Sequence, residues 1–204
     1  MYCIGLTGTI ASGKSTAIDF FRTKGIDTLN ADDIARQLTQ KDTPALAEIG
    51  QYFGDDILTP NGELNRRLLR NHIMHHPESR HWLERLLHPQ IRQKIELSIS
   101  KCHSPYCIIE IPLLTDRSAY PYLQRVLLIT ALSQQQIERL IKRDHCSENE
   151  ALALLTHQES NNNRATLADD IVFNNGSIDE LHQKLNQLHQ QYLKEALKLG
   201  SIDN

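Results

Sequence analysis

Eight residues near the start of the chain have the composition and spacing of a phosphate-binding loop. Residues 8–15 read Gly-Thr-Ile-Ala-Ser-Gly-Lys-Ser and fit the pattern G-x-x-x-x-G-K-[ST]. Glycines in such a loop let backbone N–H groups turn toward phosphate oxygens, and the following helix adds the positive end of its dipole. We expect Lys14 to reach the β- and γ-phosphates of a nucleotide and the Ser15 hydroxyl to hold Mg²⁺.

The flanks of the loop favour this prediction over a chance glycine-rich turn. Residues 2–7 form a short apolar run that is typical of a strand, and residues 15–23 carry apolar side chains at helical spacing. A strand, a loop and a helix in this order are the context that the motif requires.

The rest of the chain alternates apolar runs with helical patterns. Such uninterrupted apolar runs are typical of parallel strands that are buried on both faces. Strands are expected at residues 3–7, 107–111, 126–130 and 171–173, with a weaker one at 28–30. The alternation predicts an α/β fold whose five-stranded parallel sheet is flanked by helices.

Two helical regions interrupt this alternation. Residues 60–103 hold two helical stretches joined around His76-Pro77, and residues 139–167 are helical and polar. We expect the first to be a helical insertion that lies outside a nucleotide-binding core. That core would comprise residues 1–59, 104–138 and 168–204.

Local signals predict where several helices begin and which face of the last helix is buried. Thr43-Pro44 is typical of a helix start, and the segments beginning at Ser133 and Ser147 fit capping boxes. An apolar stripe at helical spacing should dock the last helix on the sheet. Its members are Ile178, Leu181, Leu185, Leu188 and Tyr192.

Composition excludes several classes of protein. The 204 residues carry a net charge of -3, so no overall positive field favours nucleic acid. The chain has no apolar run of about 18 residues and no secretory signal, and so we expect a cytoplasmic protein that does not enter membranes. The four cysteines lack C-x-x-C spacing, and we expect each to be a small apolar filler or a free thiol and not part of a disulfide or a metal site. His72, His75 and His76 are close together, but a solvated helix end explains them better than a metal site.

The loop alone is compatible with kinases, GTPases and ATPases. A GTPase would carry Asn-Lys-x-Asp and Asp-x-x-Gly, and neither pattern occurs in the chain. Transporter ATPases and motors are usually longer. A small kinase that phosphorylates a hydroxyl group remains, and it needs a carboxylate near the acceptor, cations around the moving phosphoryl group and a lid against water.

Four side chains are candidates for these tasks. Asp32 follows the second strand, at the sheet edge where ligands bind, although it could instead cap a helix beginning at Ile34. Arg139 and Arg143 share a helix face and would clamp phosphates, or would form a solvated basic face. Glu110 lies in an apolar strand run, where Lys14 or Mg²⁺-bound water would balance it, unless an edge position turns it to water.

Six segments match one family in the same order along the chain. They are residues 4–16, 30–36, 87–89, 111–114, 142–147 and 168–176. These segments resemble LTGGIGSGKST, DADxIAR, LHP, PLL, KRDxxS and ADxVIxNxG of the dephospho-coenzyme A kinase family. The resemblance covers nearly the whole chain and implies a P-loop kinase fold, in which residues 60–103 form a helical, substrate-binding insertion for CoA and residues 139–167 form a helical lid. It also implies that ATP phosphorylates the ribose 3′-hydroxyl of dephospho-CoA.

The resemblance also implies roles for individual residues. Asp32, Lys14 and Arg143 would be catalytic, and Ser15 would hold the metal ion. The ATP-binding set would be Gly8, Ala11, Ser12, Gly13, Lys14, Ser15, Thr16, Arg139, Asn175 and Gly176. The substrate-binding set would be Asp32, Arg66, His88, Pro112 and Leu113. The chain departs from the family pattern at Thr9, Ala11, Asn30, Asn65, Asp116 and His145.

Two other functions are compatible with the loop. Another small-molecule kinase, of the nucleoside or shikimate type, would share it but lack Leu87-His88-Pro89 together with the long helical insertion. A non-catalytic module would bind ATP without turnover. For the enzyme we expect ATP, Mg²⁺ and dephospho-CoA as ligands, no nucleic acid or membrane partner, and a monomer or weak homo-oligomer.

Overall fold

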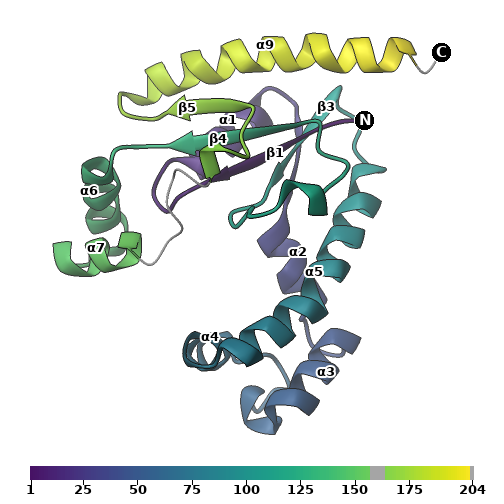
Figure 1. The fold of residues 1–204 in the computed structure, drawn as a ribbon, viewed down its shortest axis with the longest axis vertical. Helices are drawn as coiled ribbons and strands as arrows, with labels where there is room; N and C mark the ends of the chain where they lie inside the picture. Colours follow the sequence, from purple (N-terminus) through teal and green to yellow (C-terminus); the bar gives the residue numbers. More distant parts are fainter. Residues whose placement is uncertain (157–163, 203–204) are drawn as a thin grey trace. The chain divides into compact units, whose positions relative to one another are not determined.

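A computed structural model of the chain describes residues 1–156 and 164–202 (Figure 1). The chain divides into two compact units, residues 1–30 with 99–204 and residues 31–98. The second unit thus begins before residue 60, the boundary expected for the helical insertion. Among the helices described, none is both long and apolar enough to cross a membrane.

The first unit is built on a five-stranded sheet in the order β2-β3-β1-β4-β5. Every neighbouring pair of strands is parallel, and so the expected sheet is confirmed, including its weakest strand. The strands are β1 (Tyr2–Gly8), β2 (Asp27–Asn30), β3 (Tyr106–Glu110), β4 (Arg125–Thr130) and β5 (Asp170–Phe173). Their carboxyl ends lie at one edge, because Leu6 and Asn30 both align with Glu110 and Thr130 aligns with Phe173.

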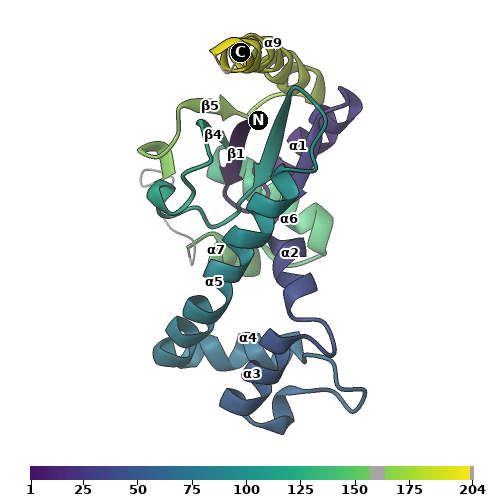
Figure 2. The same cartoon turned by 90° about the vertical axis from the view of Figure 1, so that its right-hand side faces the viewer.

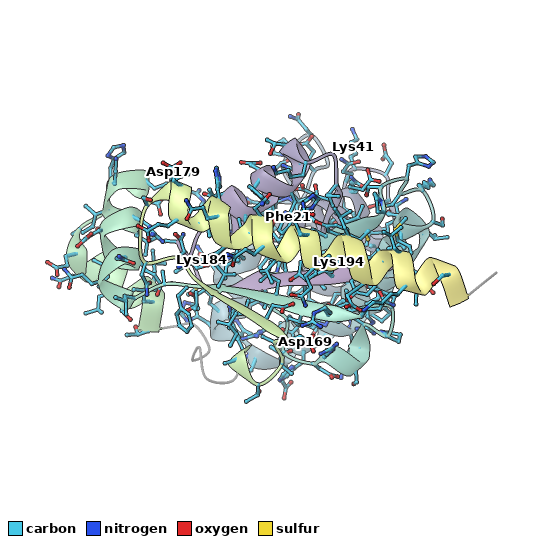
Figure 3. All side chains as sticks on the ribbon, turned by 90° about the horizontal axis from the view of Figure 1, so that it is seen from above. Phe21, Lys41, Asp169, Asp179, Lys184 and Lys194 are labelled. Atoms are coloured by element: carbon cyan, nitrogen blue, oxygen red, sulfur yellow. The ribbon has the colours of Figure 1, made fainter. Side chains whose placement is uncertain are left out.

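Two helices, α1 (Lys14–Thr23) and α9 (Ile178–Ile202), cover one face of this sheet. Figure 3 shows α9 crossing above the strands with Phe21 of α1 beneath it. The predicted stripe is confirmed at Leu181, Leu185, Leu188 and Tyr192, which pack into the core. It is wrong at Ile178, which is 63% exposed because this first helical residue lies outside that core.

The opposite face of β1 is covered by the segment that follows β3. This segment contains the short helix η2 (Arg117–Ala119) and ends next to β4. A Cβ atom on Gly5 would lie 2.9 Å from Cδ1 of Leu123, so the absent side chain lets Leu123 pack directly on the strand. Cys3 and Cys107 are free thiols, as expected, with sulfur atoms 3.5 Å apart.

After β4 the chain forms α6 (Ser133–Asp144) and α7 (Glu148–Thr156). The capping box at Ser147 is confirmed, because Ser147 and Glu150 exchange hydrogen bonds between side chain and backbone N–H. The one at Ser133 is wrong, because that residue lies inside α6 and Gln136 turns toward the phosphate-binding loop instead. His145 ends α6 with a left-handed φ of 54°.

The second unit is helical and has its own apolar core. It contains α2 (Ala31–Leu38), α3 (Pro44–Phe53), η1 (Asp55–Ile57), α4 (Arg66–His75) and most of α5 (Pro77–Ile99). Leu46 and Ile49 of α3 pack with Leu69 of α4 and Leu83 of α5. Figure 2 shows α3 beside α4. The predicted break between two helices at His76-Pro77 is confirmed.

Helix starts in this unit differ in part from the sequence prediction. Thr43 precedes α3 with Pro44 at its first position, as expected, but its hydroxyl donates to the Gln40 carbonyl and does not cap the helix. Helix α2 begins at Ala31 rather than Ile34, which puts Asp32 in the first turn. The proposed cap role of Asp32 is therefore wrong. The rings of His72 and His76 stack with centroids 4.2 Å apart.

One buried polar pair under α9 makes stability depend on pH. The Tyr106 hydroxyl and His189 Nδ1 share a hydrogen bond of 2.7 Å, and both side chains are buried. Burial, with a smaller contribution from the charge of Lys24, lowers the pKa of His189 below its ordinary 6.5. In the unfolded chain the ring therefore takes up a proton at a higher pH than it does in the folded protein.

We predict that this pair costs stability in mild acid. The free energy of unfolding contributed by His189 should fall as the pH drops through about 6.5 toward the lower folded-state pKa. Urea unfolding between about pH 7.5 and about pH 5.5 should show a weaker pH dependence for His189→Leu than for the wild type. Tyr106→Phe should cost about 1 kcal/mol but keep the pH dependence, because burial is the larger cause. Equal pH dependence in all three proteins would contradict this account.

Candidate active site

The two glycines that define the loop are required by close contacts. A Cβ atom on Gly8 would collide with the Ile129 carbonyl oxygen of the neighbouring strand. Gly13 precedes α1 with a φ of 104°, and a Cβ atom there would collide with Nδ2 of Asn174. Only glycine combines this backbone with so little space. The sequence motif thus fixes the path of the chain between β1 and α1.

Polar groups inside the loop suit a phosphate. Lys14 Nζ donates to the Gly8 and Thr9 carbonyl oxygens, each at 2.9 Å, so its charge lies within the loop. In the part of the chain described, the buried Ser12 hydroxyl lacks a hydrogen-bond partner, and a phosphate oxygen would satisfy it. Ser15 is exposed in the first turn of α1, and its hydroxyl is a hard oxygen ligand of the kind Mg²⁺ accepts.

Ala11 adopts a left-handed backbone, with a φ of 55°, at one of the positions where the family pattern has glycine. This conformation costs an L-residue roughly 1–2 kcal/mol. Arg139 donates to the Ala11 carbonyl at 3.2 Å and to the Asn174 carbonyl at 2.8 Å, and so it ties the loop to the end of β5.

The structure brings Arg139 to the loop and directs Arg143 elsewhere. Arg143 lies one turn later on α6 and forms a two-pronged ion pair with Asp144 at 2.7 and 2.8 Å. Both side chains are exposed, and the carboxylate raises the pKa of Arg143. The catalytic role of Arg143 remains a prediction.

Two loop contacts come from residues that the sequence analysis did not select. Gln136 Nε2 donates to the Ile10 carbonyl at 2.7 Å and to the Thr9 hydroxyl, and Asn174 Nδ2 donates to the Ser12 carbonyl at 2.8 Å. The capping-box pattern concealed the role of Gln136. Asn174 lies beside Asn175 in the 168–176 segment that resembles the family, which was a usable signal.

Asn175 and Gly176 connect β5 to neighbouring elements. Asn175 accepts from the Leu132 N–H at 2.9 Å through its side chain and from Gln135 at 2.6 Å through its carbonyl. A Cβ atom on Gly176 would collide with the Glu180 carboxylate. The hydrogen bonds of Asn175 thus connect the start of α6 to the end of β5. The contact of Asn175 and Gly176 with ATP stays a prediction.

A carboxylate and an amide meet at the carboxyl ends of β3 and β2. Asn30 Nδ2 donates to Glu110 Oε2 at 2.7 Å. The edge position suggested for Glu110 is wrong, because β3 lies between β2 and β1 and the side chain is half-buried. The amide of Asn30 thus supplies the partner that a half-buried carboxylate needs.

Pro112 and Leu113 follow β3 in the same unit. The Pro112 carbonyl accepts from the Thr7 hydroxyl and from Arg164, each at 3.4 Å. Arg164 is only 2% exposed, whereas Leu113 is 69% exposed. The Leu113 side chain is therefore an exposed apolar group one residue after Pro112.

The other predicted substrate residues lie in the second unit. Asp32 is exposed in the first turn of α2. Arg66 donates to the Thr39 hydroxyl at 2.9 Å, and its pKa is lowered by partial burial and by nearby Arg36. His88 lies on α5 and borders an open groove of about 440 Å³. The groove is lined by His81, Glu84, Arg85, His88, Pro89 and Arg92.

Gly13 is required both by its positive φ and by the lack of space for a Cβ atom. We predict that alanine substitutions at Gly13 and at a control glycine separate these two requirements. Gly13→Ala should abolish most ATP binding measured by calorimetry, because the new Cβ displaces Asn174. Gly25→Ala is the matched control, since Gly25 has a φ of 74° but no atom near its Cβ position. The control should lose roughly 1–2 kcal/mol of stability with unchanged ATP binding. Similar ATP affinities in the two variants would contradict the role of the contact.

Comparisons with known proteins agree with the site. A family model described as dephospho-CoA kinase matches residues 2–180. The dephospho-CoA kinase of Legionella pneumophila (strain Lens) is 50% identical over 196 residues, covering 96% of this chain and 98% of that protein.

Two solved structures share the fold over nearly their full length. The crystal structure of TT1252 from Thermus thermophilus has a TM-score of 0.80 and 28% identity, covering 93% of this chain and 97% of that one. Dephospho-CoA kinase from Campylobacter jejuni has a TM-score of 0.69 and 27% identity, with 95% and 98% covered. With its phosphate-binding loop at the carboxyl edge of a parallel sheet, this chain belongs to the dephospho-CoA kinase family.

Proposed function

We propose that the enzyme transfers the γ-phosphoryl group of ATP to the ribose 3′-hydroxyl of dephospho-CoA, giving CoA and ADP. The observation that carries this proposal is the glycine loop with Lys14 inside it, in a chain 50% identical to a dephospho-CoA kinase. Phosphoryl transfer needs little covalent chemistry from the protein, and its catalysis comes mainly from positioning and charge.

Lys14 and Ser12 would bind the nucleotide phosphates. Lys14 Nζ now donates to two loop carbonyls, and on binding it would exchange them for phosphate oxygens. The carbonyl oxygens are neutral acceptors, whereas phosphate oxygens carry negative charge, and this added attraction favours the exchange. The unpaired Ser12 hydroxyl would add a further donor. Gly8, Ala11, Gly13 and Thr16 would complete this contact.

Ser15 would hold Mg²⁺ through its hydroxyl group at the start of α1. When bound, Mg²⁺ would offset the negative charge of the nucleotide phosphates. Its ligands would then be this hydroxyl, phosphate oxygens and water, a set of hard oxygen donors that suits Mg²⁺.

Asp32 would orient the acceptor hydroxyl and accept its proton. A carboxylate is acceptor-only when ionised, which suits this task. Arg143 would stabilise charge on the transferred group after leaving its exposed pair with Asp144, a bond worth little in water. Arg66, His88, Pro112 and Leu113 would contact dephospho-CoA, and residues 139–167 would exclude water. The cytoplasmic location and the oligomeric state remain predictions.

The test is a panel of acceptors assayed with ATP and Mg²⁺. We expect ADP and CoA to form with dephospho-CoA, and no turnover with shikimate or nucleosides. Lys14→Ala controls for contaminating kinases and should lower kcat by about 10²–10³-fold, because it removes a charge that stabilises the transition state. Turnover of a nucleoside but not of dephospho-CoA would contradict the proposal. ATP binding without any turnover would indicate a non-catalytic module.

Adjacent acids give a matched test of the acceptor base. Asp32→Asn should lower kcat by about 10²–10⁴-fold with little change in ATP affinity, because it removes a proton acceptor. Asp33→Asn, one residue later, should leave kcat nearly unchanged, since Asp33 forms an exposed pair with Arg36 at 3.4 Å. Equal losses in both variants would assign the effect to the first turn of α2 and not to Asp32.

A further inference from the structure

We propose that Gln136 and Asn174 are positioning residues that act with Arg139 to preorganise the phosphate-binding loop. The three side chains donate hydrogen bonds to three consecutive carbonyl groups of the loop. Gln136 donates to the carbonyl of Ile10, Arg139 to that of Ala11 and Asn174 to that of Ser12. We call these three side chains the carbonyl clasp. The donor–acceptor distances are 2.7, 3.2 and 2.8 Å.

The clasp determines where loop N–H groups point. In a planar trans peptide, the C=O of one residue and the N–H of the next point in opposite directions. Holding the Ile10 and Ser12 carbonyls against the clasp therefore turns the N–H groups of Ala11 and Gly13 away from it. Backbone N–H groups directed into one concavity are what binds a phosphate anion.

The clasp is rigid because its members support one another. Gln136 is 2% exposed and Asn174 is 7% exposed. Arg139 also donates to the Asn174 carbonyl at 2.8 Å, and the Asn174 N–H donates to the Thr130 carbonyl at 2.7 Å. The donors are thus fixed to α6, β4 and β5 before a nucleotide arrives, which lowers the cost of ordering the loop on binding.

Gln136 has no spare N–H for other partners. Its two amide hydrogens match two acceptors, the Ile10 carbonyl and the Thr9 hydroxyl. Thr9 is one of the positions where the family pattern has glycine, so this chain adds an acceptor that engages Gln136 fully. Without the clasp, the three carbonyl oxygens could turn toward the phosphate and repel it.

The inference rests on the proposed function only in taking ATP as the ligand of the loop. Gln136→Leu removes both donors at similar size and should raise the KM and Kd for ATP about tenfold. The KM for dephospho-CoA should not change, and kcat should change much less than KM, because the loop binds phosphate in both ground and transition states. Gln134→Leu is the matched control, since Gln134 lies in the same helical turn and its side chain, within the part of the chain that the structure describes, bonds only the exposed Glu138.

A second variant distinguishes positioning from simple destabilisation. Gln136→Glu puts a carboxylate against the Ile10 carbonyl oxygen, to which only the protonated acid can donate, so the pKa of the new carboxyl group should rise. ATP affinity relative to the wild type should therefore recover as the pH falls from about 8 to about 6. Gln134→Glu should show no such recovery. A merely structural role would lower the melting temperature without this pH-dependent return of ATP binding.

The outcomes separate the inference from the proposed function. Unchanged ATP affinity in both Gln136 variants would overturn the clasp, as would a loss of affinity that pH does not reverse in Gln136→Glu. If Gln136→Leu does not fold, Asn174→Asp provides the same comparison, because it replaces the donor to Ser12 with an acceptor. Wild-type protein that bound no ATP would instead contradict the proposed function.

Discussion

The attachment of the phosphate-binding loop to α6 and β5 is the interaction on which the rest of the site depends. Residues from three distant parts of the sequence meet there: the loop after β1, the first turns of α6 and Asn174 after β5. The parallel sheet makes this possible because it brings the carboxyl ends of β1, β4 and β5 to one edge. Packing of α1 and α9 on the sheet then stabilises the strands that form that edge.

Two residues with strained backbones are each held by a nearby hydrogen bond, and only the first belongs to this attachment. Ala11 and His145 both have left-handed backbones where the family pattern has glycine, with φ values of 55° and 54°. Ala11 is held by Arg139 through its carbonyl, whereas the His145 N–H still closes the last turn of α6 on Ile141. Each conformation costs roughly 1–2 kcal/mol for a residue with a Cβ atom. The surrounding bonds must offset that cost for the loop and the helix end to keep these shapes.

Sequence patterns correctly predicted strands, helix ends and caps that depend on neighbouring residues. They gave the wrong partner for a side chain when a residue distant in the sequence competed with a local one. The five strands, the helix break at His76-Pro77 and the Ser147 capping box all depend on neighbouring residues, and all are confirmed. Gln136 had the spacing of a capping residue, but a buried loop carbonyl is a partner that only the tertiary fold provides. The family-like segment around Asn174 pointed to its neighbourhood, but its bond to the Ser12 carbonyl also depends on the tertiary fold. Glu110 needed the strand order, which no periodicity encodes, before an edge position could be rejected.

The clasp also limits how the proposed lid can move. The segment expected to close over ATP begins at Arg139, yet Arg139 is itself bonded to Ala11 and to the Asn174 carbonyl. Breaking those bonds would expose loop carbonyls to the incoming phosphates, which opposes binding. Closure must therefore leave the first turns of α6 in place and use residues beyond them. Arg143 meets this condition, because the partner of its guanidinium group within residues 1–156 and 164–202 is the adjacent and exposed Asp144. Under the proposed function, α6 would therefore carry one cation that holds the loop and, one turn later, a second cation that is free to move toward bound nucleotide.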